Sequence, residues 1–337
     1  MAADSMIGGS IADGRSNLEY KDRMVWIPGG TFTMGSDNHY PEESPTHGVK
    51  VAGFWIDRDP VTNREFQRFV DAIDHVTVAE RRADASDYPD ANPDLLVPAS
   101  VVFRKPDRPV DLRDPYGWWA YVPGASWRHP QGPESSINGL GDHPVVHVAW
   151  EDVEAYARWA QKQLPTEAEW EFAARGGRDG ATYAWGNAFA PGGRLMANTW
   201  QGSFPIENTL QDGYEGTSPV GAFPPNSYGL RDMIGNVWEW TEDWYQEHGA
   251  IAHSCCTVEN PRGGVRDHSY DPRTPAIRIP RRVMKGGSHL CAPNYCRRYR
   301  PAARMAQAID TSTCHLGFRC ILRTPLTERR GGEHLQE

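Results

Sequence analysis

Glycine and proline interrupt this chain of 337 residues along most of its length, with 33 glycines and 27 prolines. Strands and helices do not alternate as a parallel sheet requires, and the elements between turns are short. The chain also contains 13 tryptophans and 13 tyrosines, which supply enough aromatic surface for a core. The sequence therefore predicts one large α+β domain with many loops and little regular secondary structure.

Both ends of the chain are polar and are predicted to be mobile: residues 1–22 and 326–337 flank a single domain at 23–325. No apolar stretch is long enough to span a membrane, and the first residues lack the apolar core of an export signal. The formal net charge of -9 disfavours nucleic acid and anionic membranes as partners. We therefore expect a cytoplasmic protein with reduced thiols.

Three helices are predicted from apolar residues that recur with the helical period and from capping residues at their starts. They cover residues 62–73, 150–163 and 165–177. Thr62 and Glu65 are placed to form a capping box in the first helix, and Thr166 and Glu169 repeat this arrangement in the third. Alternating residues predict short strands within 24–36 and 49–62.

Cys291 and Cys296 are the first candidates for chemistry, because Pro293-Asn294 between them predicts a turn that brings the two sulfurs together. Nearby positive charge lowers the pKa of a thiol toward the reactive thiolate. Four arginines follow the pair: Arg297, Arg298, Arg300 and Arg304. Two such sulfurs can form a disulfide, hold a soft ion such as Cu(I), or be buried structural cysteines. The spacing leaves these alternatives open.

Two loop segments, 197–216 and 228–244, set Asn, Asp and Glu among glycines. Irregular loops of this kind can supply the oxygen ligands that calcium prefers, although Asx turns explain the same composition and neither segment matches an EF-hand. A calcium site in these loops is therefore one of two open interpretations.

Other cysteines and histidines are predicted to be structural. His143 and His147 have a spacing that converges on a metal in a helix, but Pro144-Val145-Val146 between them favours a strand. Cys255 and Cys256 are adjacent, so they cannot easily share one ion or bridge each other, and we expect loop thiols.

Several motifs in one order are more specific than any single feature. They are MVWIPGGTFTMGS, HPVVHVAWEDVEAYARWAQKQLPTEAEWEFAARGG, PPNSYGLRDMIGNVWEWTEDWY, GGSHLCAPNYCRRYRPAAR and HLGFRC. Over residues 24–320 the chain resembles the formylglycine-generating enzymes, also called sulfatase-modifying factors, and among them a bacterial-type member. The resemblance implies a C-type-lectin-like α+β fold.

The resemblance also implies a copper-dependent oxidase that uses dioxygen to convert a cysteine in a CxPxR-type motif into Cα-formylglycine. The partner would be an unfolded or nascent sulfatase polypeptide. Cys291 and Cys296 match the family's Cu(I) ligands, and the substrate thiolate would complete a three-sulfur site. Five further residues match positions that line the family's pocket: Ser288, Trp238, Tyr295, Arg304 and His315. The resemblance implies that these residues contact dioxygen, form the apolar wall of the pocket and orient the thiolate.

Two structural calcium ions are implied by the same resemblance. The first would be bound by the side chains of Asn198 and Asp212 and the carbonyls of Thr199 and Tyr214. The second would be bound by the side chains of Asp232 and Glu239 and the carbonyls of Gly235 and Val237. These ions would clamp loops that lack regular hydrogen-bond ladders.

The chain departs from the family pattern in three ways. Two disulfides of secreted relatives cannot form, because Ala174 stands opposite Cys320 and Pro301 replaces a second cysteine. Cys314 replaces a small hydroxyl residue and is a candidate third thiol that competes for copper or forms an oxidative disulfide. The segment 247–282 is longer than in animal relatives and is predicted to be a surface excursion that shapes the peptide groove.

Two alternatives of other classes compete with the oxidase. A lectin-like binding module without chemistry is disfavoured because both cysteines of the pair are present. A nonheme-iron sulfoxide synthase of related fold would need an additional helical domain with histidine ligands, which the 23 residues before Met24 are too few to supply. The sequence therefore favours the oxidase.

Overall fold

The computed structural model describes residues 23–248 and 257–323. The segments predicted to be mobile, 1–22 and 326–337, lie outside the described residues, as do Cys255 and Cys256. Within the described ranges, every helix is too short or too polar to cross a lipid bilayer.

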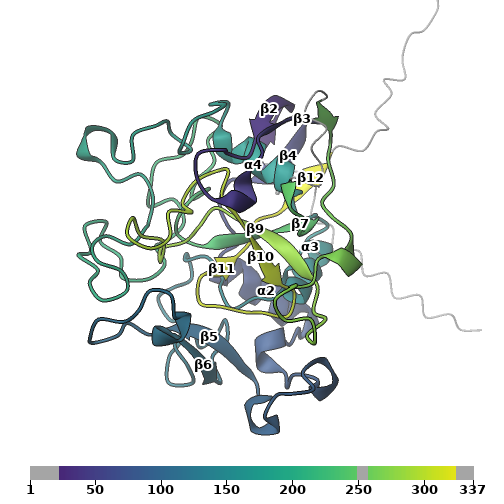
Figure 1. Ribbon diagram of the computed structural model, residues 1–337, viewed down its shortest axis with the longest axis vertical. Coiled ribbons are helices and arrows are strands. Elements are labelled where there is room, and N and C mark those ends of the chain that lie inside the picture. The colour runs from purple at the N-terminus through teal and green to yellow at the C-terminus, as the bar shows by residue number, and fades with distance from the viewer. Residues whose placement is uncertain (1–22, 249–256, 324–337) are drawn as a thin grey trace, which may run out of the picture.

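Within the described residues, short strands form four small sheets (Figure 1). One antiparallel sheet contains β1 (Met24–Ile27), β4 (Phe54–Asp57) and β12 (Ile321–Arg323), with β4 in the middle. The second contains β2 (Gly30–Met34), β3 (His47–Val51) and β8 (Val258–Glu259), and the third pairs β5 (Ala99–Phe103) with β6 (Trp119–Pro123). The fourth has the order β10 (Arg304–Ala308), β9 (Arg281–Lys285), β7 (Trp238–Trp244) and β11 (Leu316–Gly317). β2 and β3 lie near one end of the molecule, and β5 and β6 lie near the other (Figure 1).

The predicted strands at the start of the chain are confirmed as β1 to β4, but β1 and β2 belong to different sheets. The turn between them requires glycine, because Gly29 has a φ of 74° and a Cβ there would lie 2.6 Å from the carbonyl oxygen of Val51. The chain therefore leaves the first sheet and enters the second within a few residues.

All three predicted helices form. α2 (Asn63–Ile73) begins with the expected capping box of Thr62 and Glu65 and buries Phe66, Phe69 and Val70. α4 (Glu167–Arg175) has the expected capping box of Thr166 and Glu169 and ends at Gly176 with a φ of 57°. Single turns of 3-10 helix are found at Pro41–Glu43, Val78–Glu80, Ala85–Asp87, Pro93–Leu95, Pro115–Gly117, Pro191–Gly193 and Arg266–His268.

The second helix, α3 (Trp150–Trp159), is shorter than predicted. The prediction extended to residue 163, but Gln161 has a φ of 54° and Gln163 forms a bridge with Ile321 at the C-terminal end of the described chain. Lys162 is drawn away to an ion pair with Asp57. Contacts with residues distant in sequence therefore end this helix early.

The strand predicted around Pro144-Val145-Val146 is wrong. The segment makes one isolated bridge, between Pro144 and Thr62, and turns at His147, which has a φ of 60°. The structural role predicted for the histidines fits their contacts: Nδ1 of His147 lies 2.7 Å from the Ser100 hydroxyl, and its Nε2 lies 2.9 Å from the Pro130 carbonyl oxygen.

Two clusters of buried apolar residues form the core. The larger cluster lies among α2, α3, α4 and the first, second and fourth sheets, and it includes Cys291 and Cys296. The smaller cluster lies beside β5 and β6 and includes Leu290 and Ala292. The segment that carries the two cysteines is therefore held between the two clusters. The prediction of an α+β domain with little regular structure is confirmed.

Candidate active site

The two candidate cysteines lie on the loop from β9 to β10 with their sulfurs 3.2 Å apart. Both side chains are buried and both thiols are free. The predicted turn forms, because the backbone N–H of Cys296 donates to the carbonyl oxygen of Ala292 at 2.9 Å. The sequence therefore predicted correctly that the chain brings these two sulfurs together.

The two sulfurs differ in their protonation. Burial raises the pKa of Cys291 well above its ordinary value. The pKa of Cys296 is lowered to about 6, first because the Cys291 thiol donates a hydrogen bond to it and then because the Arg298 guanidinium is near. At neutral pH this arrangement favours a thiol on Cys291 and a thiolate on Cys296.

The donor set fits a soft ion. Two cysteine sulfurs with apolar neighbours suit Cu(I), whereas hard cations prefer oxygen ligands. The sulfur separation of 3.2 Å exceeds the disulfide bond length of about 2.05 Å, and this separation would have to widen to admit an ion between the sulfurs.

The loop between β2 and β3 covers this segment and orients one arginine toward the pair. Nη1 of Arg298 lies 3.9 Å from the sulfur of Cys296. Its Nε and Nη2 donate to Glu42 at 3.1 and 2.5 Å, and its guanidinium lies 3.8 Å from the centre of the Tyr40 ring. Glu42 and Tyr40 were not predicted, since they are more than 250 residues away in sequence and no local pattern marks them.

The resemblance placed Arg304 in the pocket, but its guanidinium forms hydrogen bonds away from the two sulfurs. It donates to both carboxylate oxygens of Glu167 at 2.7 and 2.8 Å, and to the carbonyl oxygens of Glu42 and Gln246. The arginine that contacts a sulfur of the pair is Arg298. Arg304 therefore joins the β2–β3 loop to α4.

Two of the other predicted residues flank the sulfurs. The backbone N–H of Ser288 points to the Cys291 sulfur at 3.4 Å, and the Ser288 hydroxyl accepts from the backbone N–H of Leu290. Tyr295 stacks on Phe204 with ring centres 4.6 Å apart and remains 38% exposed. Tyr295 is therefore the member of the predicted set that faces solvent beside Cys296.

Trp238 begins β7 of the fourth sheet, and His315 lies on the turn directly before β11. The backbone N–H of Trp238 donates to the carbonyl oxygen of His315 at 2.8 Å, and the Trp238 ring is buried in the larger cluster that also contains the two cysteines. Nδ1 of His315 lies 2.6 Å from the Thr313 hydroxyl, and burial lowers the pKa of His315 to about 3. His315 is therefore neutral and its ring lies edge-on to Trp119.

Cys314 and the segment at 247–282 were also singled out by the sequence. The sulfur of Cys314 accepts a hydrogen bond from the backbone N–H of Phe103 at 3.2 Å, and burial raises the pKa of Cys314 to about 11. The described part of the segment pairs with β3 through β8 and bonds to the end of β7 through Gly263 and Asp243. Its contacts thus reach the second sheet and the end of the fourth.

A cavity of about 580 Å³ borders the cysteine segment, and His289, Leu290 and Cys314 form part of its wall. Trp127 and Trp200 line the same cavity, and their buried indole N–H groups have no hydrogen-bond partner among the described residues. Unpaired buried donors of this kind require an acceptor from water or from a ligand.

The first predicted calcium set is brought together around Gln201. The amide of Gln201 donates to the carbonyl oxygen of Thr199 and, at 2.7 Å, to the carboxylate of Asp212. The side-chain oxygen of Asn198 is buried without a partner among the described residues. A buried oxygen without a partner is compatible with a hard cation. The backbone N–H of Tyr214 donates to Asp212.

The two carboxylates of the second predicted calcium set differ in whether their oxygens have partners. One carboxylate oxygen of Asp232 is buried without a partner in the described part of the chain, and burial raises the pKa of this group to about 6. Glu239, in contrast, has both oxygens on Arg319 at 2.8 Å and accepts from the Trp170 indole as well. Gly235 and Val237 lie on the turn that leads into β7. Asp232 is therefore the member of this set with a free acceptor.

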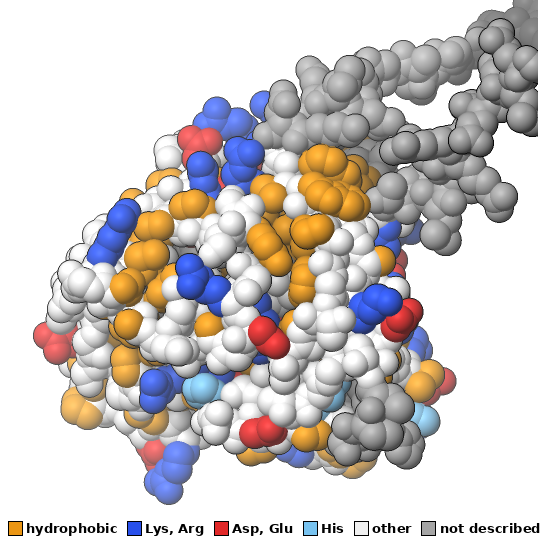
Figure 2. All heavy atoms as spheres, turned by 90° about the horizontal axis from the view of Figure 1, so that it is seen from above, with side chains coloured by type: hydrophobic (Ala, Val, Ile, Leu, Met, Phe, Trp, Pro, Cys, Tyr) orange, Lys and Arg blue, Asp and Glu red, His pale blue; other side chains and the backbone are white. Residues whose placement is uncertain are grey.

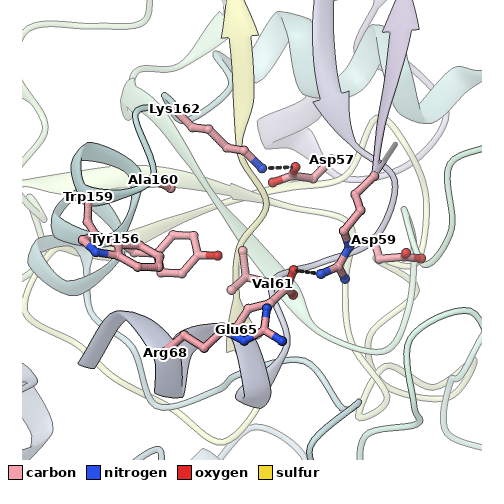
Figure 3. Close-up of a pocket in the computed structure, with 10 residues that line it drawn as sticks. Asp57, Asp59, Val61, Glu65, Arg68, Tyr156, Trp159, Ala160 and Lys162 are labelled. Carbon is pink, nitrogen blue, oxygen red and sulfur yellow. Dashed lines mark hydrogen bonds and ion pairs between the residues drawn. The ribbon is translucent and has the colours of Figure 1, made fainter. Parts of the chain in front are cut away.

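A second large cavity, of about 650 Å³, lies between α2, α3 and the segment after β4 (Figure 3). None of the predicted site residues lines it. Its charged groups are already paired in part, because Lys162 bonds to Asp57 and Arg23 bonds to Glu65, each at 2.5 Å.

On the face seen in Figure 2, Lys and Arg side chains lie among acidic and uncharged ones.

Comparisons with known proteins show the family to which the chain belongs. Residues 13–324 match the family model of the sulfatase-modifying factor enzyme 1-like domain. The chain is 52% identical to the formylglycine-generating enzyme of Mycobacterium tuberculosis over 88% of this chain and 97% of that protein. It is 48% identical to the formylglycine-generating enzyme of Thermomonospora curvata over 91% of this chain and 95% of that protein.

Among solved structures, PvdO from Pseudomonas aeruginosa is similar with a TM-score of 0.58 and 26% identity, over 89% of this chain and 94% of that chain. The fold is consistent with the C-type-lectin-like fold that the sequence predicted. With the family model matched across nearly the whole described chain, this protein belongs to the sulfatase-modifying factor family, the formylglycine-generating enzymes.

Proposed function

We propose that this protein is a copper-dependent oxidase that uses dioxygen to convert a cysteine of a sulfatase, within a CxPxR-type motif, into Cα-formylglycine. The observation that supports this proposal most is the pair of buried, free thiols of Cys291 and Cys296, with sulfurs 3.2 Å apart, next to the partly exposed Tyr295. The names of the relatives support the same activity.

The residues around the pair have distinct tasks in this proposal. Cys296, which is 8% exposed against 2% for Cys291, is the sulfur nearer to solvent and would face the incoming substrate cysteine. Tyr295, which is 38% exposed beside Cys296, offers an aromatic surface to the peptide. Trp238 and its apolar neighbours exclude water from the inner sulfur.

Cys291 and Cys296 would hold the copper ion. When bound there, Cu(I) would supply the one-electron chemistry with dioxygen that amino-acid side chains lack. The cavity beside Leu290 is where we place residues that flank the substrate cysteine, because this cavity borders the segment that carries the two cysteines.

We also propose two structural calcium sites, one at Asn198 and Asp212 and one at Asp232. The buried unpaired oxygens of Asn198 and Asp232 support them. Calcium satisfies such oxygens and links loops that have few backbone hydrogen bonds of their own.

The test is an assay with a synthetic peptide that contains CxPxR. The protein is loaded with Cu(I), incubated with the peptide in air or without dioxygen, and probed with an aldehyde-reactive hydrazine. We expect aldehyde in air and none without dioxygen or without copper. Aldehyde formation that ignores copper or dioxygen would contradict the proposed chemistry, and a peptide that is bound but never modified would favour a lectin-like module.

A further inference from the structure

The arginines after the cysteine pair are not equivalent in their contacts. Arg300 is fully buried and its guanidinium forms an ion pair with Glu43. Arg304 likewise forms an ion pair with Glu167. Arg298 differs because it shares its guanidinium between a carboxylate, Glu42, and a cysteine sulfur, that of Cys296.

The geometry holds Arg298 from three sides. Glu42 accepts from two of its nitrogens, and Tyr40 stacks against its plane at 3.8 Å. The hydroxyl oxygen of Tyr40 in turn accepts from the backbone N–H of Arg297 at 3.0 Å. A Cβ on Gly287 would lie 2.7 Å from the Arg298 carbonyl group, so the backbone is closely packed as well. A surface arginine has no such restraints.

The net charge of the proposed copper centre explains why a restrained arginine beside the sulfurs would be useful. Two thiolates on a monovalent ion leave one net negative charge, and a substrate thiolate would add another. A buried negative charge is costly unless a cation lies close to it. The guanidinium of Arg298, 3.9 Å from the Cys296 sulfur, is the cation placed to balance it.

We propose that Arg298 is the counter-charge of the thiolate-bound copper ion, and that Glu42 on the β2–β3 loop positions it. The proposal rests on the copper-dependent function proposed above. Arg298 and Glu42 act through Cys296 and are positioning residues. The β2–β3 loop then has a role in metal binding although it supplies no ligand.

The affinity for Cu(I) tests this proposal without an activity assay. The protein, free of dioxygen, competes with the chromophoric chelator bathocuproine disulfonate for Cu(I). For Arg298→Gln we expect an affinity about 10- to 100-fold weaker than that of the wild type, the range found when groups behind metal ligands are removed. The matched control is Arg297→Gln, which changes the net charge equally and should stay within about threefold, because it removes no contact to the sulfur.

Glu42→Gln separates positioning from general electrostatics. Removing a negative charge near an anionic centre would tighten Cu(I) binding if charge were all that mattered. If Glu42 orients Arg298, the affinity instead falls by about tenfold. In the Arg298→Gln background, Glu42→Gln should no longer weaken Cu(I) binding, since the group it orients is gone.

The outcomes are distinguishable. Unchanged affinity in Arg298→Gln, or an equal loss in Arg297→Gln, overturns the proposal, and so does tighter binding in Glu42→Gln. If Arg298→Gln does not fold, Arg298→Lys carries the test: it keeps the charge but loses the two bonds to Glu42, and unchanged affinity in it and in Glu42→Gln overturns the proposal. A wild type that binds no Cu(I) contradicts the proposed function itself, whereas a wild type that binds Cu(I) and forms aldehyde limits the failure to this inference.

Discussion

Single side chains decide the chemistry of this molecule, because most of its charged groups near the cysteines are buried and paired. Glu43 and Arg300 are 0% and 1% exposed, and each is the other's ion-pair partner. Breaking one member of such a pair leaves the other charge buried without compensation. Ion pairs between the same residue types on the surface contribute little to the free energy of unfolding.

We therefore expect Glu43→Gln to lower the free energy of unfolding by about 3–5 kcal/mol, the usual cost of breaking a buried ion pair. The matched control is Glu259→Gln, which removes the exposed pair between Glu259 and Lys50 and should cost about 1 kcal/mol or less. Urea unfolding of the two variants checks this. Equal effects would contradict the claim that the β2–β3 loop is held by buried charge.

His147 gives a prediction on pH at the same scale. Burial lowers the pKa of His147 to about 4, below the ordinary 6.5, so the folded state keeps this ring neutral. The unfolded state takes up a proton as the pH falls through 6.5, and the folded state does so only near 4. Between these values the folded state therefore loses about 1.4 kcal/mol of stability per pH unit from this group.

His147→Asn should remove this dependence, and Asn tolerates the positive φ of 60° at this position. The measurement is the slope of the unfolding free energy against pH between 6.5 and 4. The variant will be less stable overall because it packs less well, but its slope should be smaller by about one proton. A slope equal to that of the wild type would show that His147 is not neutral in the folded protein.

At the scale of elements, local sequence predicted what local physics determines. The capping boxes at Thr62 and Thr166 marked the starts of α2 and α4 correctly, because caps depend on residues within one turn. The end of α3 and the segment around His147 were predicted wrongly. Gln163 bridges to Ile321, and His147 bonds to Ser100 and Pro130, and no local pattern carries these partners.

The turn before β7 gives a prediction for a single element. Gly235 has a φ of 77°, and a Cβ there would lie 2.4 Å from the carbonyl oxygen of Asn198, so Gly235→Ala must shift backbone. We expect it to lower the unfolding free energy by about 3 kcal/mol or more. Gly180→Ala is the control: its φ is 71° but nothing lies within 4 Å, so only the backbone cost of about 1 kcal/mol applies. Thermal melts that rank the two variants equally would contradict the close packing of these loops.

Calcium removal tests the two proposed ion sites. We expect a chelator to lower the melting temperature by several degrees, because an ion that binds the folded state alone stabilises it by mass action. Elemental analysis should find two calcium ions per chain, and one in Asp232→Asn and in Asp212→Asn. If the protein contains no calcium and its melting temperature does not change with the chelator, both proposed sites are contradicted.

At the scale of the whole molecule, the candidate active site joins parts of the chain that the sequence keeps far apart. The cysteine pair and its turn were predictable, because they lie within six residues and a turn dipeptide separates them. Glu42 and Tyr40, which hold Arg298, were not, since only the folded chain brings the β2–β3 loop to the loop between β9 and β10. The arginines were predicted as a group, and the fold selects which of them contacts a sulfur.

The many glycines and prolines of the sequence acquire a meaning at this scale as well. They allow loops, which form much of the molecule in Figure 1, to turn between small sheets and to meet around buried polar groups. Regular elements supply the two apolar clusters, and the cysteine segment lies between those clusters. The sulfurs are thus held by a rigid interior although they lie on a loop.

The central claim is that the sulfurs of Cys291 and Cys296 together form the centre at which a substrate cysteine is oxidised. The most direct test is the mass spectrum of a CxPxR peptide after incubation in air with each Cu(I)-loaded single variant. We predict the formylglycine product from the wild type and from Cys314→Ser, whose sulfur bonds to the Phe103 backbone, and none from Cys291→Ser or Cys296→Ser. Product from either of the last two variants at the wild-type rate would contradict the account.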